Sequence, residues 1–273
     1  MKPIKKIALL HSLCSVGKAS ITNMVPVLSV MGIEACPIPT IMLSTHTGGY
    51  GAPAKQNISP EYIKNCADHY RLNNVEFDAI FIGYLGNSEM LSVVRYFVEQ
   101  FPNAIKILDP IMGDHGKLYA LVEEDYIQSF RELIPLMDII LPNLTEACFL
   151  AGKPFDENAS FESLKEICNY FHNNNVQQVI ITSACMDLDE RGIVYSNKME
   201  FDCMKFEAKS KNFHGSGDVF DAVFVAALLQ GIETKEAIHK AHNFVAECIE
   251  ESGRFEYPTK EGLLTESRLS MLV

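Results

Sequence analysis

Positive charge is scarce in this sequence. Its 273 residues include 23 lysines and arginines against 35 aspartates and glutamates, which gives a formal net charge of -12 at pH 7. A protein that holds the phosphate backbone of a nucleic acid needs clustered cations, so this deficit argues against a nucleic-acid partner. A small-molecule partner fits better. An anionic ligand would have to be met locally by backbone N–H groups, a few cations or a metal ion.

Long apolar runs and paired cysteines are also missing. No stretch of 18 consecutive apolar residues occurs, so the sequence predicts no membrane span. The eight cysteines form no C-x-x-C pair and no zinc-type cluster with histidine, which is typical of reduced thiols. The short apolar run near the start ends at His11 without a small-residue cleavage site, which predicts a first strand rather than a secretion signal. We therefore expect a soluble, cytoplasmic protein.

Short apolar runs alternate with segments of helical periodicity along most of the chain. Apolar strands that alternate with helices predict a parallel sheet covered on both faces. Because no internal repeat or long polar linker interrupts the pattern, we expect one doubly wound α/β domain over residues 1–273. The expected strands are 7–12, 35–43, 77–82, 104–108, 138–141, 177–183, 191–197 and 200–208, and the expected helices are 21–32, 59–74, 88–100, 122–136, 144–152, 160–174, 216–230 and 235–251. Pro37 and Pro39 predict that 35–43 is an edge or irregular strand.

Two common nucleotide-binding motifs are absent. A dinucleotide fingerprint beginning at "GSG" (215–217) would need a third glycine where Phe220 stands, which argues against a dehydrogenase. A phosphate-binding loop in "SLCSVGKAS" (12–20) would need glycine at the position of Ser12 and serine or threonine at that of Ala19. Any nucleotide must therefore be bound in another way.

The stretch "HGSGD" (214–218) stands at the start of an expected helix. Consecutive N–H groups of Gly215, Ser216 and Gly217, together with the helix N-terminus, could form an anion hole for a phosphoryl group. Asp218 could then accept the proton of an attacking hydroxyl group. In the simpler interpretation the glycines only shape a turn, and the aspartate is a favourable charge in the first helical turn.

Further acidic residues follow two other expected strands. Asp109 ends the strand in "ILDPIMGD", and Asn143 and Glu146 follow the next strand in "LPNLTE". Separately, each could be a turn or cap former. Because the carboxyl ends of parallel strands meet at one edge of the sheet, Asp109 and Glu146 could together hold the hydrated Mg²⁺ of a nucleotide polyphosphate. This combination favours a kinase. Asp221, one turn beyond Asp218, is interpreted only as a helix-start charge.

Taken together, these segments resemble the ribokinase-like superfamily and, within it, the pyridoxal kinases. The match runs from about residue 4 to 250 and is densest in "DPIMGDHGKLY", "LIPLMDIILPNLTEACFLAG", "VIITS" and "HGSGD". The segments "HS" (11–12), "STHTGGYG" (44–51) and "GYLGN" (83–87) look like the vitamin-binding segments of that family. They favour a pyridoxal kinase over its relative, a hydroxymethylpyrimidine kinase.

The resemblance implies a mechanism, its cofactors and its site residues. A kinase of this kind would transfer the γ-phosphoryl group of ATP, with Mg²⁺, to the 5′-hydroxymethyl group of pyridoxal, pyridoxine or pyridoxamine. Relatives are often dimers, so a homodimer is also implied. The implied site residues are Ser12, Thr47 and Tyr84 at the vitamin ring, Asp109, Asn143, Thr182 and Ser183 at ATP, Asp109 and Glu146 at Mg²⁺, Gly215, Ser216 and Gly217 as the anion hole, and Asp218 as the base.

Two other functions remain as alternatives. The first is a hydroxymethylpyrimidine kinase, which would carry out the same reaction on a thiamine precursor. The second is a non-catalytic nucleotide-binding or vitamin-binding protein that kept the fold, although the acidic residues argue against it. The roles of His11, His46 and His214, which lie near the expected site, are left open.

Overall fold

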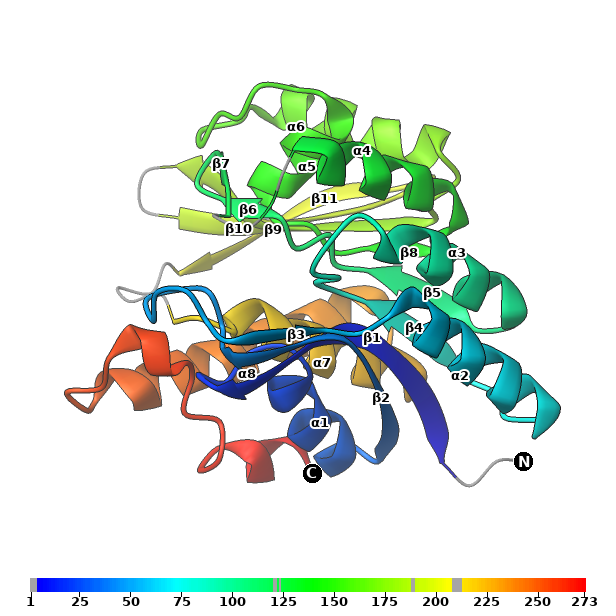
Figure 1. The fold of residues 1–273 in the computed structure, drawn as a ribbon. Coiled ribbons are helices and arrows are strands. Elements are labelled where there is room, and N and C mark those ends of the chain that lie inside the picture. Colours follow the sequence, from blue (N-terminus) through cyan, green and yellow to red (C-terminus); the bar gives the residue numbers. More distant parts are fainter. Residues whose placement is uncertain (1–3, 120–121, 123, 188–189, 208–212) are drawn as a thin grey trace.

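The computed structural model describes residues 4–119, 122, 124–187, 190–207 and 213–273. One nine-stranded sheet runs through it in the order β11-β10-β9-β8-β5-β4-β1-β2-β3 (Figure 1). The six strands from β9 to β2 are parallel to one another, whereas β3, β10 and β11 are antiparallel additions at the two edges. The predicted fold class, a doubly wound and mostly parallel sheet, is confirmed.

The predicted strands and helices occur in the predicted order along the chain, and β3, β6 and β7 are additional. The strands are β1 (Lys5–Val16), β2 (Ile33–Thr45), β3 (Lys55–Asn57), β4 (Ala79–Ile82), β5 (Ile105–Leu108), β8 (Ile139–Ile140), β9 (Gln178–Asp187), β10 (Glu190–Asn197) and β11 (Phe201–Glu207), with a separate small hairpin of β6 (Gly113–Asp114) and β7 (Lys117–Leu118). The helices are α1 (Ile21–Val30), α2 (Pro60–Leu72), α3 (Met90–Gln100), α4 (Glu124–Leu133), α5 (Leu144–Ala151), α6 (Phe161–Asn173), α7 (Ser216–Leu229) and α8 (Thr234–Gly253), with 3₁₀ turns η1 (Ile134–Leu136), η2 (Thr259–Glu261) and η3 (Leu269–Leu272).

Helices cover both faces of the sheet (Figure 1). Alternate residues of β1 show the two layers: Ala8 and Leu10 pack in a core with α2 to α6, while Ile7 and Leu9 pack in a second core with α1, α7 and α8. All four side chains are fully buried. Burial on both faces explains why the central strands read as continuous apolar runs rather than as alternating ones.

The edge beside β2 differs from the prediction. Residues 35–43 were expected to form an edge or irregular strand because of Pro37 and Pro39. The strand is irregular, since its register with β1 shifts between His11 and Leu13. It is not the edge, because the unpredicted strand β3 pairs with Ile41–Leu43, beyond the two prolines. Proline has no N–H to donate, so pairing begins where the backbone donors return.

The sheet changes winding direction between β1 and β4. Helix α1 follows β1 and packs on one face, whereas α2 and α3, which flank β4 in the chain, pack on the other. Ligands of doubly wound sheets bind beyond the carboxyl ends of the strands at such a switch point. The fold therefore predicts a ligand site at the residues just after β1, β4, β5 and β8.

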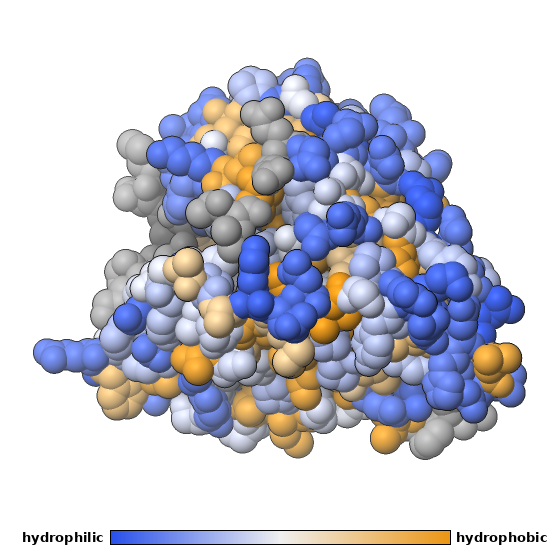
Figure 2. All heavy atoms as spheres, in the orientation of Figure 1, coloured by the Kyte–Doolittle hydropathy of each residue, from blue (hydrophilic) through white to orange (hydrophobic). Residues whose placement is uncertain are grey.

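Hydrophobic and hydrophilic residues are interspersed over the described part of the face that Figure 2 shows. Within the described parts of the chain, no helix has both the length and the apolar character needed to cross a membrane. The single domain over 1–273, the homodimer and the cytoplasmic location stay predictions.

Candidate active site

A cavity of about 580 Å³ opens at the carboxyl ends of the central strands. Its volume lies in the range of small-molecule sites. The structure brings every predicted site residue to this one cavity, although their roles stay predictions. The cavity is lined by Ser12, Thr47, Tyr84, Asp109, Asn143, Glu146, Thr182, Ser183, Gly215, Ser216, Gly217 and Asp218, all of which were predicted, and by residues such as Cys14, His46, Asp114, His214 and Asp221.

The turn before α7 is built by a glycine that no other residue could replace without movement. Gly215 is the N-cap of α7 with a left-handed φ of 77°. A Cβ atom there would lie 2.1 Å from the carbonyl oxygen of Lys18. The turn therefore packs directly on the loop after β1. The first N–H groups of α7 lack partners within the helix, so the positive end of the helix dipole lies at the cavity wall.

Gly217 differs from Gly215 because nothing in the protein requires a glycine there. A Cβ atom at this position would meet no atom within 4 Å, and its φ is not left-handed. The residue is exposed and lines the cavity. A side chain at this position would occupy only the space in front of the α7 amides. This is the arrangement expected where a ligand approaches the backbone closely.

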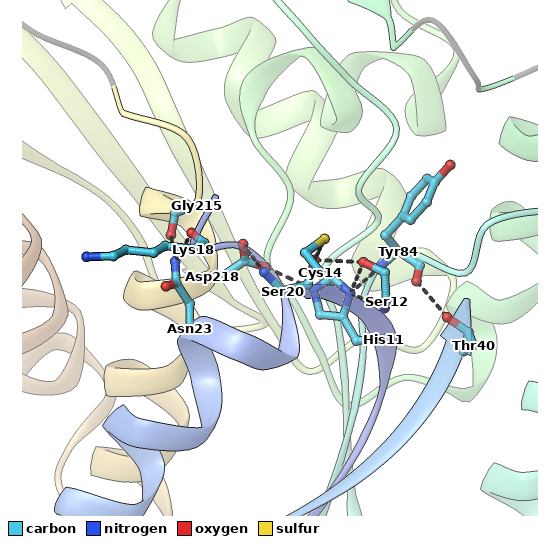
Figure 3. Close-up of polar contacts among 10 residues, drawn as sticks. All are labelled: His11, Ser12, Cys14, Lys18, Ser20, Asn23, Thr40, Tyr84, Gly215 and Asp218. Atoms are coloured by element: carbon cyan, nitrogen blue, oxygen red, sulfur yellow. Dashed lines mark hydrogen bonds and ion pairs between the residues drawn. The ribbon is translucent and has the colours of Figure 1, made fainter. Parts of the chain in front are cut away.

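Asp218 is held by two N–H donors that come from different segments. Its Oδ1 atom lies 2.9 Å from Nε2 of His11 on β1, and Oδ2 accepts a 2.8 Å hydrogen bond from the backbone N–H of Ser20. Figure 3 shows these three residues pointing toward one another. The side chain is buried but lines the cavity. A carboxylate oxygen has more than one lone pair, so Asp218 can accept a further hydrogen bond from a ligand.

Asp221 is part of the site, which corrects its interpretation as a simple helix-start charge. It is only 2% exposed, lines the cavity and interacts electrostatically with Asp109. Burial, followed by the charge of Asp221, raises the pKa of Asp109 well above its usual range, and burial does the same for Asp221. These surroundings favour the protonated forms of the two carboxyl groups. The sequence signal was an aspartate within an otherwise apolar helix, three residues after Asp218.

Glu146 and Asn143 form the capping box of α5, so the simpler interpretation of these residues describes their local structure. The side chain of Asn143 accepts from the N–H of Glu146 at 3.0 Å, and the side chain of Glu146 accepts from the N–H of Asn143 at 2.9 Å. Glu146 also accepts from the N–H of Met112 at 3.0 Å. Burial raises the pKa of Glu146 despite these bonds, with a further contribution from the charge of Asp109.

These carboxyl groups fit a divalent cation that binds together with phosphate. Asp221 Oδ2 is buried and has no hydrogen-bond partner among the described residues. The described residues that line the cavity include no lysine or arginine. Within the same residues, no three histidine, cysteine or acidic side chains are arranged to hold a metal by themselves. Mg²⁺ is typically held in this way, by one or two carboxylates with water and phosphate oxygens.

The loop after β2 closes one side of the cavity through His46. Its Nδ1 atom accepts from the N–H of Gly48 at 3.0 Å, so Nε2 carries the proton and donates to the carbonyl oxygen of Lys260 at 2.6 Å. The ring of His214 lies 4.7 Å from that of His46, measured between centroids. A Cβ atom at Gly48 would lie 2.3 Å from His214. Partial burial and the nearby His46 lower the pKa of His214.

The predicted ring-binding residues Ser12, Thr47 and Tyr84 line the same cavity. The hydroxyl group of Ser12 is 2.7 Å from that of Ser20, and Ser12 is 1% exposed, so its hydroxyl is already engaged. Tyr84 is half-buried, and its ring extends away from the Asp218 network in Figure 3. Burial raises the pKa of its phenol group. Thr47 is exposed within the loop after β2.

The fold and this site define a kinase of the ribokinase-like class. A Bacteroides thetaiotaomicron structure, described as a phosphomethylpyrimidine kinase in a crystal form with pyridoxal, superposes with a TM-score of 0.93. It is 33% identical, over 98% of this chain and 96% of that one. Within this class, the chain belongs to the phosphomethylpyrimidine kinase family, whose model matches residues 17–262.

The chain is similar both to pyridoxal kinases and to hydroxymethylpyrimidine/phosphomethylpyrimidine kinases. Pyridoxal kinase from Ovis aries is 28% identical over 224 residues, which are 73% of this chain and 69% of that protein. Hydroxymethylpyrimidine/phosphomethylpyrimidine kinase from Staphylococcus aureus is 27% identical over 252 residues, which are 85% of this chain and 87% of that protein. The predicted membership of a vitamin kinase family is confirmed, and the particular substrate is not decided by these similarities.

The open space at Gly217 leads to a first prediction. We expect Gly217→Ala to fold with unchanged or higher stability, because alanine favours a helix by up to about 1 kcal/mol over glycine. Kinase turnover should fall about 10- to 100-fold, because the methyl group blocks access to the α7 amides. Thermal melting and a coupled ADP-release assay measure the two effects. The matched control is Gly253→Ala, since a Cβ atom there also meets nothing within 4 Å at the far end of α8. Equal activity of the two variants would show that no ligand approaches the α7 amides during turnover.

The raised pKa of Asp221 leads to a second prediction. Because the pKa of Asp221 is raised on folding, its contribution to stability is present at low pH and is lost as the pH rises. We expect Asp221→Asn to be more stable than the parent at pH 8 by at least about 1 kcal/mol, with the difference shrinking toward pH 4. Urea unfolding in EDTA measures it.

The control for this prediction has the opposite sign. The pKa of Asp68 is lowered by hydrogen bonds from Tyr96 and Lys64 on the surface. Asp68→Asn should therefore lose stability at neutral pH, and its difference from the parent should shrink as the pH falls. If Asp221→Asn were less stable than the parent at pH 8, the prediction would be wrong. The ionised carboxylate of Asp221 would then have to be stabilised by a hydrogen bond or a cation in the folded protein.

Proposed function

We propose that this protein phosphorylates the 5′-hydroxymethyl group of pyridoxal, pyridoxine or pyridoxamine with ATP. The single observation that carries the proposal is the position of Asp218. A buried carboxylate, held by two N–H donors, shares one cavity wall with the free amides at the start of α7. A base for a hydroxyl group and an anion hole for a phosphoryl group are thus adjacent. Phosphoryl transfer needs both.

The reaction uses these groups in a defined way. The hydroxyl oxygen of the vitamin attacks the γ-phosphorus atom of ATP while Asp218 accepts the hydroxyl proton. The bond between the γ-phosphorus and the bridging oxygen of ATP breaks, and ADP leaves with that electron pair. The N–H groups of Ser216 and Gly217 stabilise the negative charge of the transferred group. The loop around His46 and Thr47 covers the cavity and limits access of water.

Mg²⁺ fits beside this wall. Asp109, Asp221 and Glu146 would hold it, because these residues supply carboxylate oxygens to the cavity. When bound, the ion would neutralise phosphate charge in a cavity whose described residues supply none of the cationic side chains that could do so. The described carboxylates would otherwise repel ATP, so the electrostatics of the cavity also support a nucleotide that arrives with its metal.

Vitamin B6 is favoured over a pyrimidine as the acceptor by one observation. The Bacteroides thetaiotaomicron relative, at 33% identity, was crystallised with pyridoxal. The family model and the Staphylococcus aureus relative favour the second candidate, a hydroxymethylpyrimidine or phosphomethylpyrimidine kinase. Both candidate reactions would use Asp218 and the α7 amides for phosphoryl transfer. They differ only in the acceptor ring that would contact Ser12, Thr47 and Tyr84.

The base assignment leads to a third prediction. Asp218→Asn should bind ATP and the vitamin normally but lower turnover by about 100-fold or more, because the hydroxyl proton has no acceptor. Isothermal titration measures binding, and ADP release under saturating substrates measures turnover. Asp68→Asn on the surface of α2 is the control and should retain full activity. Unchanged turnover in Asp218→Asn would refute the role of this residue.

The acceptor is tested by a fourth prediction. Purified protein with ATP and Mg²⁺ is offered pyridoxal, pyridoxine, pyridoxamine, hydroxymethylpyrimidine and its monophosphate in separate ADP-release assays. We expect kcat/KM for the best vitamin B6 compound to exceed that for both pyrimidines by at least about tenfold, which corresponds to about 1.4 kcal/mol of discrimination. The reverse order would establish the pyrimidine kinase. No turnover of any acceptor would favour a non-catalytic binding protein.

A further inference from the structure

His11 is a fully buried histidine inside the apolar strand β1, and its role was left open by the sequence. Its ring stacks on Phe81 of β4, with 6.0 Å between centroids and an interplanar angle of 29°. The fold makes room for it: a Cβ atom at Gly83 would lie 2.5 Å from the ring. A strand interior with this composition would ordinarily hold an aliphatic residue, so the imidazole needs a reason to be there.

The hydrogen bonds of His11 fix its tautomer. Nδ1 accepts from the N–H of Ser12 at 2.8 Å and from the N–H of Tyr84 at 3.1 Å. A ring nitrogen that accepts from two backbone amides carries no proton, so the proton of the neutral imidazole is on Nε2. Nε2 therefore donates to Oδ1 of Asp218 at 2.9 Å. Adding a second proton at Nδ1 would break both amide bonds, so His11 is unsuited to act as an acid or base itself.

The second oxygen of Asp218 is fixed by the loop after β1. Ser20 donates its N–H to Oδ2 from a backbone with a positive φ of 61°, and Lys18 in the same loop has a φ of 50°. Such conformations persist only where the surroundings hold them. Asn23 holds this loop against the α7 turn, because its side-chain amide donates to the carbonyl oxygens of Lys18 and Gly215, at 2.5 and 3.1 Å (Figure 3).

We propose that His11 is a positioning residue that orients Asp218 for proton abstraction. The proposal rests on the proposed function, because it assumes that Asp218 is the base. Nε2–H of His11 directs one carboxylate oxygen, Ser20 directs the other, and the remaining lone pairs are left for the substrate hydroxyl. The histidine keeps its own proton throughout, and the hydroxyl proton ends on Asp218.

The test compares two side chains of similar length and volume at this position. In His11→Gln the side-chain amide can still donate to Asp218, whereas His11→Met has no donor. We expect His11→Gln to retain turnover within about fivefold and His11→Met to lose about 100-fold in kcat, with KM for ATP unchanged. A loss of kcat at unchanged KM that is rescued by a side chain able to donate is what a positioning role predicts.

Two further variants separate positioning from general damage to the fold. Gly83→Ala keeps His11 but displaces its ring, so it should also lower kcat with KM for ATP unchanged, even if His11→Met does not fold. His172→Leu removes a histidine that is hydrogen-bonded through both nitrogens on α6, outside the cavity. It should change stability only. Equal losses of kcat in His11→Gln and His11→Met would overturn the proposal, because they would mean a purely structural role.

A double-mutant cycle distinguishes the two proposals. If His11 acts through Asp218, adding His11→Met to Asp218→Asn should cause no further loss of turnover. If Asp218→Asn is inactive and His11→Met behaves like the parent, only the positioning role fails. If Asp218→Asn itself retains turnover, the base assignment fails and the role of His11 falls with it.

Discussion

The geometry of the site depends on one buried carboxylate that two N–H donors hold from different parts of the chain. Asp218 on α7 meets His11 on β1 and Ser20 in the loop after β1, which are 207 and 198 residues away in sequence. A carboxylate placed in a protein interior is costly unless it is paired, so α7 can dock in this position only if both donors are in place. The same contacts that satisfy the carboxylate therefore fix where the helix begins, and with it the free amides at the cavity.

Close backbone approach makes this arrangement possible. Gly215 allows the α7 turn to lie against the carbonyl of Lys18, and Gly83 leaves room for the ring of His11. In both places a Cβ atom would overlap a neighbour, so glycine is required by packing within the protein. Gly217 is the opposite case, because only an approaching ligand would be blocked. Glycine is thus required at these positions for different physical reasons, and a short sequence motif does not distinguish between them.

Much of this could be predicted from local sequence, and the exceptions share one cause. Apolar strands alternating with helices predicted the sheet, and the strand-end rule predicted that Asp109 and Glu146 would lie together. Strand β3 escaped prediction because Lys55–Asn57 is short and polar, and it is a strand only through its pairing with β2. The raised pKa values of Asp109 and Asp221 and the tautomer of His11 also depend on contacts between distant segments. In each case a local pattern cannot name the partner.

The acidic residues of the cavity show how surroundings divide one residue type among several tasks. Glu146 is held by backbone amides and caps α5, so its structural role comes first. Asp109 and Asp221 have mainly each other, so burial favours their protonated forms until a cation arrives. Asp218 instead has N–H donors at both oxygens. In the proposed reaction, this difference in hydrogen bonding assigns proton transfer to Asp218 and metal binding to the other pair.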